Sequence, residues 1–325
     1  MGISEKAIER LSDWPRARIA QSLNRSIALL LFCFILSSCT SIRPVIKIGL
    51  LAPFEGLQRR SGYVALTAMR QAIADSAPAT VAIMPLALDS GADPAGVERA
   101  ARKLLQDDAV RAIVGPYSPL LMQELTSIVA ATDLPWLFPF AINPTDGFVT
   151  PNELSDWMLP LLQAAAEVAA ALGSQRLVLA GWPPGWPQLT ATQAQTLFAL
   201  PVRLDESVTA VEATDALFWL GSAEEGAVYL MALRAHLPTV PFLVGPHVDA
   251  PIFSEQTQIS GPVYLLSWED DGYDQWRTRY ADQPPTAYLT YRATQTAIAW
   301  SLGQPSSKNG AWRVKTIALV GDPVQ

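Results

Sequence analysis

Short β-branched runs alternate with stretches of helical periodicity along most of this chain of 325 residues. Val45–Leu51 is the first such run, and Tyr63–Asp75 follows it with apolar residues at helical spacing. Asp93 and Pro94 then supply the N-cap and first-turn residues that open a helix. Alternation of this kind predicts βαβ units and parallel sheets. We therefore expect an α/β fold with mostly parallel sheets flanked by helices.

A stretch rich in Pro, Asn, Asp and Gly, residues 141–152, interrupts the alternation and indicates a linker or hinge. A second α/β series follows it, and half of the residues are hydrophobic, which is enough for two cores. The remaining elements that we expect are helices over 118–132, 156–172, 224–236 and 287–302, and strands over 81–88, 111–115, 134–138, 176–180, 216–220, 242–244, 263–266 and 312–320.

The N-terminal leader contains an apolar run, Ile27–Ile35, that lies behind Arg25 and ends in Leu36-Ser37-Ser38-Cys39. A basic flank, a short apolar core and small residues are the parts of a secretory signal. A Cys after Leu-Ser-Ser resembles a bacterial lipobox, which implies removal of residues 1–38 and attachment of lipid to Cys39. The run is shorter than the roughly 20 apolar residues of a spanning helix, yet an uncleaved anchor stays open as the alternative. The lipobox predicts an extracytoplasmic protein, lipid-anchored at the periplasmic face or the cell surface.

Charge and residue types argue against several classes of activity. The chain has 23 basic and 30 acidic residues, a net charge of −7, and an acidic chain without basic blocks is not expected to bind nucleic acid. The two Cys and two His are Cys33, Cys39, His236 and His247, too few for thiol catalysis or a His- or Cys-based zinc site. A Gly-x-Ser-x-Gly elbow is also absent from the sequence. We expect no enzyme, no cofactor and no metal, and a hydrolase is the least favoured alternative.

Several segments between Ile46 and Pro139 resemble the amino-terminal lobe of type I periplasmic binding proteins. They are Ile48-Gly49-Leu50-Leu51-Ala52-Pro53-Phe54-Glu55-Gly56, Leu88-Asp89-Ser90 through Leu104, and Val114-Gly115-Pro116-Tyr117-Ser118 followed by Leu134-Pro135-Trp136. The resemblance is to the leucine/isoleucine/valine-binding, or amide-binding, receptors of ABC transporters. Pro285–Ala299 is similar to the late helix that returns to the first lobe in that group.

This resemblance implies a two-lobed type I fold with three hinge crossovers and a ligand in the cleft. Lobe 1 would contain residues 45–145 and 275–305, and lobe 2 residues 150–270 and 311–325. The implied function is a monomeric solute-binding receptor that delivers an amino acid or related small polar ligand to an ABC permease. The alternative is an envelope lipoprotein of the same fold that acts as a regulator or interaction module with a degenerate cleft.

Ligands of open parallel sheets bind beyond the carboxyl ends of the strands, so the loops at those ends hold the candidate site residues. Ser118 follows a strand and starts a helix, where backbone N–H groups favour an anionic group such as a carboxylate. The family places a serine there against the ligand carboxylate, and it supplies a second hydroxyl where Thr145 lies. A plain N-cap and a hinge turn are the respective alternatives. Tyr117, Phe54 and Glu55 are further candidates in the first-lobe loops.

The second lobe offers three more candidates. Trp182 and Trp186 lie in a Pro-rich loop after a strand and predict an apolar or stacking wall, although packing of the loop on the lobe explains them equally well. The family usually carries Tyr-Gly in this loop. Asp249 follows another strand and is placed to pair with a ligand ammonium, whereas we expect His247 to be a turn residue.

Overall fold

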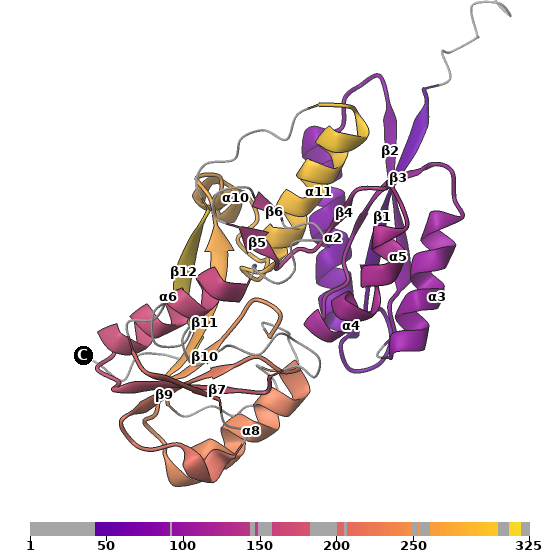
Figure 1. The fold of residues 1–325 in the computed structure, drawn as a ribbon. Helices are drawn as coiled ribbons and strands as arrows, with labels where there is room; N and C mark the ends of the chain where they lie inside the picture. The colour runs from indigo at the N-terminus through magenta and orange to yellow at the C-terminus, as the bar shows by residue number, and fades with distance from the viewer. Residues whose placement is uncertain are drawn as a thin grey trace, which may run out of the picture. The chain divides into compact units, whose positions relative to one another are not determined.

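The computed structural model describes residues 43–91, 93–143, 147–148, 158–182, 200–204, 207–248, 253, 261–304 and 312–319. Cys39, Thr145, Trp186 and Asp249 lie outside these residues, so their predicted roles stay predictions. The described strands form a four-stranded sheet, a six-stranded sheet and a two-stranded hairpin, all in the unit that begins at Val45 (Figure 1). None of the described helices has the length and apolar character needed to cross a membrane.

The four-stranded sheet, called the first sheet here, has the order β2-β1-β3-β4 and is parallel throughout. Its strands are β1 (Val45–Ala52), β2 (Ala82–Asp89), β3 (Val110–Val114) and β4 (Trp136–Leu137). In β1 the consecutive residues Leu50 and Leu51 are both fully buried. A strand covered on both faces is apolar at successive positions, which is why the sequence reads as a continuous hydrophobic run.

Helices on the first sheet are α2 (Arg59–Ser76), α3 (Pro94–Leu105), α4 (Pro119–Glu124), α5 (Thr126–Ala130) and α11 (Ala287–Ser301). The start of α3 is confirmed, since the Asp93 side chain accepts a hydrogen bond of 2.8 Å from the Gly96 N–H. The single helix predicted over 118–132 is wrong, because the chain forms α4 and α5 with a break at Leu125. Thr126 donates its hydroxyl to the Gln123 carbonyl, a local bond that competes with a regular helix.

The last long helix, α11, contacts α2 and β3 although it follows them by more than a hundred residues (Figure 1). Its buried positions include Tyr288, Ala293 and Ala297. The late segment therefore returns to the first sheet, as in the type I fold.

The six-stranded sheet, called the second sheet, has the order β12-β11-β10-β9-β7-β8. Its strands are β7 (Arg176–Ala180), β8 (Val202–Leu204), β9 (Asp215–Trp219), β10 (Phe242–Val244), β11 (Val263–Glu269) and β12 (Arg313–Ala318). Only the β11–β12 pair is antiparallel among these. The predicted fold class, two mostly parallel sheets flanked by helices, is confirmed.

Helices α6 (Met158–Ala171) and α8 (Ala223–His236) pack with the second sheet. The side chains of β7 alternate between two hydrophobic cores. Leu177 and Leu179 join the large core that also contains residues of the first sheet, whereas Val178 and Ala180 join a smaller core with α8 residues. Successive strand residues point to opposite faces, so one strand serves both. The elements that the sequence did not predict are β8, the helix α10 (Tyr273–Arg279), the 3-10 turn η2 (Val208–Ala210) and the hairpin β5 (Ile142–Asn143) with β6 (Gly147–Phe148).

Candidate functional site

The residues that follow the carboxyl ends of strands in both sheets line one cavity of ≈ 480 Å³, called the main cavity here. Tyr117 and Ser118 come from the loop after β3, and Trp182 comes from the residues after β7. The second sheet adds residues from Trp219 at the end of β9 through the start of α8. This placement agrees with the general position of ligand sites in open parallel sheets.

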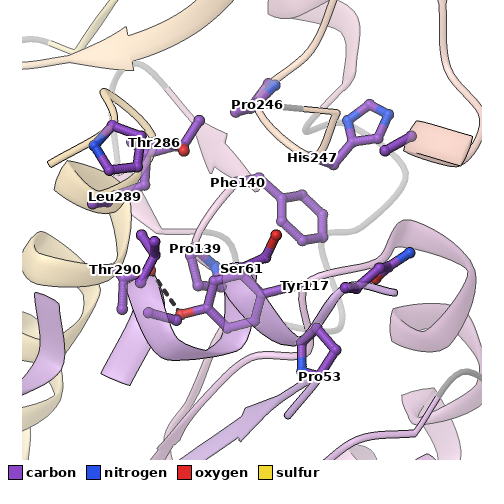
Figure 2. Close-up of a pocket in the computed structure, with 16 residues that line it drawn as sticks. Pro53, Ser61, Tyr117, Pro139, Phe140, Pro246, His247, Thr286, Leu289 and Thr290 are labelled. Atoms are coloured by element: carbon purple, nitrogen blue, oxygen red, sulfur yellow. Dashed lines mark hydrogen bonds between the residues drawn. The ribbon is translucent and has the colours of Figure 1, made fainter. Parts of the chain in front are cut away.

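A smaller cavity of ≈ 60 Å³ adjoins it and shares Gln58, Tyr117, Ala223 and His247. Figure 2 shows its lining, with Phe140 between Tyr117 and the His247–Pro246 loop. The dashed line there marks the 2.7 Å hydrogen bond between the Tyr117 and Thr290 hydroxyls. This bond ties the β3 loop to α11, and burial raises the pKa of Tyr117 above its usual value.

The loop that presents Tyr117 and Ser118 has a constrained backbone. Gly115 has φ +111, and a Cβ there would lie 2.1 Å from the Leu51 carbonyl oxygen, so no other residue fits. The Trp136 indole N–H donates to the Gly115 carbonyl at 2.5 Å, and the Gly115–Pro116 peptide bond is cis. The loop is thus held by the first-sheet core before any ligand arrives.

Ser118 is the N-cap of α4, but its hydroxyl makes no capping bond. Two other N-cap side chains do cap their helices, Asp93 at the start of α3 and Ser222 at the start of α8. The Ser118 side chain is partly exposed and lines the main cavity. Its hydroxyl is therefore available to a molecule in that cavity, and the predicted contact with a ligand carboxylate stays a prediction. Because α4 has only six residues and begins with Pro119, the predicted contribution of the helix N-terminus is small.

Phe54 and Glu55 are not among the described residues that line either cavity. The Phe54 ring packs edge-on against Tyr63 at 5.7 Å, and the Glu55 side chain points to solvent. Both backbone N–H groups donate to the Asp89 carboxylate, at 2.6 and 3.3 Å. Sequence reasoning missed this role of Asp89, although its place at the end of β2, paired with Ala52, was a usable signal.

Trp182 lines the main cavity, and it is joined there by a tryptophan that the sequence did not single out. Trp219 ends β9, and its indole N–H donates to the Ser222 carbonyl at 2.8 Å. Its ring centroid lies 5.1 Å from that of Tyr229, which lines the same cavity. The second-sheet side of the cavity therefore includes three large aromatic side chains, Trp182, Trp219 and Tyr229.

His247 lines both cavities and is more than the turn residue that the sequence predicted. Neither of its ring nitrogens is accessible to solvent or makes a hydrogen bond of normal geometry. Burial lowers the pKa of His247 to about 4, although the backbone of Leu220 and Gly221 acts in the opposite direction. The imidazole is accordingly neutral at physiological pH.

A polar contact joins the two sides of the site. The Gln58 side-chain amide donates to both carboxylate oxygens of Glu224, at 2.8 and 3.1 Å. Gln58 precedes α2 of the first sheet, and Glu224 lies in the first turn of α8. This bond therefore favours the arrangement in which the two sides of the main cavity are near each other.

The described part of the cavity carries little charge. Glu225 is its only charged lining residue among the described ones, and the Ser222 hydroxyl donates to its carboxylate at 3.0 Å. Nor do the described His, Cys, Asp and Glu residues form a group of three that could hold a metal ion. The site therefore has the chemistry of a pocket that binds by shape, aromatic contact and a few hydrogen bonds.

Comparisons with known proteins agree with this geometry. Residues 45–198 match the model of a periplasmic binding protein family. A search of the curated proteins finds no match. Among solved structures, a leucine-binding protein from Thermotoga maritima is similar, with 16% identity, a TM-score of 0.61, and coverage of 81% of this chain and 85% of that one.

Two further structures are similar at comparable levels. A branched-chain amino acid substrate-binding protein from Streptococcus pneumoniae, in complex with isoleucine, has 17% identity, a TM-score of 0.58 and coverage of 81% and 86%. A substrate-binding protein from Desulfitobacterium hafniense, in complex with Leu, has 17% identity, a TM-score of 0.55 and coverage of 79% and 84%. The chain therefore has the fold of the type I periplasmic binding proteins.

Proposed function

We propose that this protein is an extracytoplasmic solute-binding receptor that holds an amino-acid-like ligand in the main cavity and delivers it to an ABC permease. The observation that carries the proposal is a ≈ 480 Å³ cavity between the two sheets whose lining includes a serine hydroxyl that its own helix does not use. A family of binding proteins, rather than of enzymes, matches the N-terminal half of the chain. Amino acids occupy the solved relatives from Streptococcus pneumoniae and Desulfitobacterium hafniense, which supports this class of ligand.

In this proposal residues 45–145 with 275–305 act as lobe 1, and residues 150–270 with 311–325 act as lobe 2. The lobes close on the ligand by hinge motion, as is common for two-domain receptors. Thr145 and Asp249 would add a hydroxyl and a carboxylate to the site. The signal 1–38 is removed, and lipid on Cys39 tethers the receptor beside its permease.

The binding role is tested by isothermal titration calorimetry with Ser118→Ala against a panel of amino acids and amides. A hydrogen bond to a charged group contributes about 1.5–3 kcal/mol, so the affinity for a carboxylate ligand should fall by about tenfold or more. Ser301→Ala is the control, because that hydroxyl bonds only to the Ala297 carbonyl within α11. Failure of every ligand in the panel to bind the wild-type protein would overturn the receptor proposal.

The alternative, a regulator or interaction module with a degenerate cleft, is favoured by one observation. The Gln58–Glu224 hydrogen bond connects the two sides of the cavity directly, side chain to side chain. A cleft that stays closed would bind nothing in the titration. Opening it with Gln58→Ala and recovering no binding would support this alternative over the receptor.

Anchoring has its own test. Cys39→Ala should leave the protein unprocessed by the lipoprotein pathway, so that it no longer incorporates radiolabelled palmitate. Unchanged labelling of the Cys39→Ala variant would contradict the lipobox assignment. Cys33→Ala is the matched control, because that Cys lies within the apolar run.

A further inference from the structure

Trp219 occupies a slot formed by three glycines. A Cβ built on Gly181, Gly221 or Gly226 would lie 2.9, 2.7 or 2.6 Å from atoms of the indole. Real Cβ atoms do not approach other atoms this closely, so any larger residue at these positions would displace the ring. The three glycines come from the end of β7, the segment after β9 and the helix α8. The absence of a side chain at three separate positions around the second sheet thus leaves the space that this indole fills.

The indole is fixed in this slot. Its N–H is bonded to the Ser222 carbonyl at 2.8 Å, and its ring lies at 42° to the Tyr229 ring. Only 5% of the Trp219 surface is exposed, yet the residue lines the main cavity. A side chain held by a hydrogen bond and by close packing loses little further freedom when a ligand binds. Trp219 is therefore a preorganised aromatic part of the cavity wall.

The remaining wall has matching chemistry. Trp182 and Tyr117 line the cavity as partly exposed aromatic residues, and Tyr117 precedes Ser118 in the loop after β3. The cavity volume of ≈ 480 Å³ falls in the range of small-molecule sites and has room for a ring system. Aromatic rings favour other rings in edge-on or offset geometry, beyond the gain from burying their surface.

We propose that the ligand of the main cavity carries an aromatic ring, as an aromatic amino acid or a simple aromatic carboxylic acid, with the ring against Trp219 and the polar end at Ser118. This assignment rests on the proposed receptor function and specifies its substrate class. It departs from the aliphatic isoleucine and leucine bound in two of the similar structures.

The test is calorimetric titration of the wild-type protein with phenylalanine, tryptophan and phenylacetate, and in parallel with leucine and isoleucine. Aromatic ligands should bind about threefold to tenfold more tightly than aliphatic ones, because an aromatic pair contact contributes a free energy of that size. Phenylacetate lacks the ammonium group and therefore distinguishes the two ligand classes. A site for simple aromatic acids should bind phenylacetate and phenylalanine equally tightly, whereas a site for aromatic amino acids should prefer phenylalanine.

Trp219→Leu should remove this preference, so that phenylalanine and leucine bind the variant with affinities within about twofold of each other. Trp219→Phe, which keeps a ring of smaller size, and Trp182→Leu serve as milder variants if the first does not fold. The matched control is Trp300→Leu in α11, because Trp300 is not among the residues that line the main cavity. Far-UV circular dichroism establishes that each variant is folded before titration.

The outcomes separate the two proposals. Tight binding of leucine or isoleucine without binding of any ring compound would overturn the aromatic assignment and leave the receptor function standing. Absence of binding by every ligand would overturn the receptor function itself. Aromatic preference that survives undiminished in Trp219→Leu, or in Trp182→Leu if the first variant does not fold, would show that the ring does not lie against this wall and would also reject the inference.

Discussion

Three helical glycines provide a graded test of how closely this structure is packed. Gly62 lies in α2, Gly96 in α3 and Gly226 in α8. A Cβ would lie 1.9 Å from the Pro53 carbonyl oxygen at Gly62, 2.6 Å from the Trp219 indole nitrogen at Gly226, and 3.3 Å from the Asp93 carboxylate at Gly96. The new methyl group of an Ala would therefore clash with backbone at Gly62 and with a fixed ring at Gly226, whereas at Gly96 it would make a nearly normal contact.

Two opposing effects set the size of each change. Replacing Gly by Ala within a helix stabilises the folded state by about 1 kcal/mol. Overpacking costs about 1–3 kcal/mol, and more where the atom in the way is backbone that cannot move. Gly96→Ala should thus range from neutral to a gain of about 1 kcal/mol. Gly226→Ala should range from neutral to a loss of about 2 kcal/mol, and Gly62→Ala should lose about 2 kcal/mol or more.

Urea denaturation followed by far-UV circular dichroism measures these free energies, because the signal does not depend on the environment of Trp219. The expected order of stability is Gly96→Ala, then Gly226→Ala, then Gly62→Ala. A Gly226→Ala variant as stable as Gly96→Ala would refute the reasoning, since it would mean that the slot around Trp219 is loose. In that case the preorganised aromatic wall would lose its basis as well.

The other predictions concern buried polar groups. An ordinary histidine has a pKa of about 6.5, whereas burial lowers the pKa of His247 to about 4, so up to about 3 kcal/mol of the free energy of unfolding should be lost as the pH falls from 6.5 to 4. His247→Leu should flatten this pH dependence in urea titrations, and an unchanged slope would contradict the prediction. Arg292→Met removes the guanidinium 2.7 Å from the Asp270 carboxylate, which is only 2% exposed, and should lower the free energy of unfolding by about 3–5 kcal/mol. The double variant Arg292→Met, Asp270→Asn should recover part of this loss, and equal stability of the single and double variants would argue against a coupled pair. Gln58→Ala removes the hydrogen bonds to Glu224, so the radius of gyration of the ligand-free protein should rise in small-angle scattering, while the free energy of unfolding changes by about 1 kcal/mol. An unchanged radius would mean that these bonds do not hold the cavity closed.

Local signals made much of the fold predictable. The Asp93-Pro94 pair marked the start of α3, and runs of buried apolar residues marked β1, β7 and β10. The elements that escaped prediction lack such signals. β8 has two exposed residues of three, and α10 has only Tyr273 and Trp276 buried among polar neighbours.

The site was predictable only in part, because single residues acquire roles from distant partners. The place of Ser118, Tyr117 and Trp182 after strand ends could be predicted from the sequence, and the structure puts all three in the lining of the main cavity. Trp219 looked like the last residue of a buried strand. Its role depends on glycines up to 38 positions away in sequence, among them Gly181, that meet only in the folded sheet. No local pattern carries that information.

The return of α11 to the first sheet bears on how the protein is made. All four strands of that sheet lie before residue 138, but the helix that covers α2 and β3 begins at Ala287. A nascent chain therefore leaves the ribosome with an uncovered apolar surface until the segment that begins at Ala287 has been synthesised. The first sheet therefore completes its packing only after both halves of the chain have been synthesised, so it cannot mature as an independent unit ahead of the second.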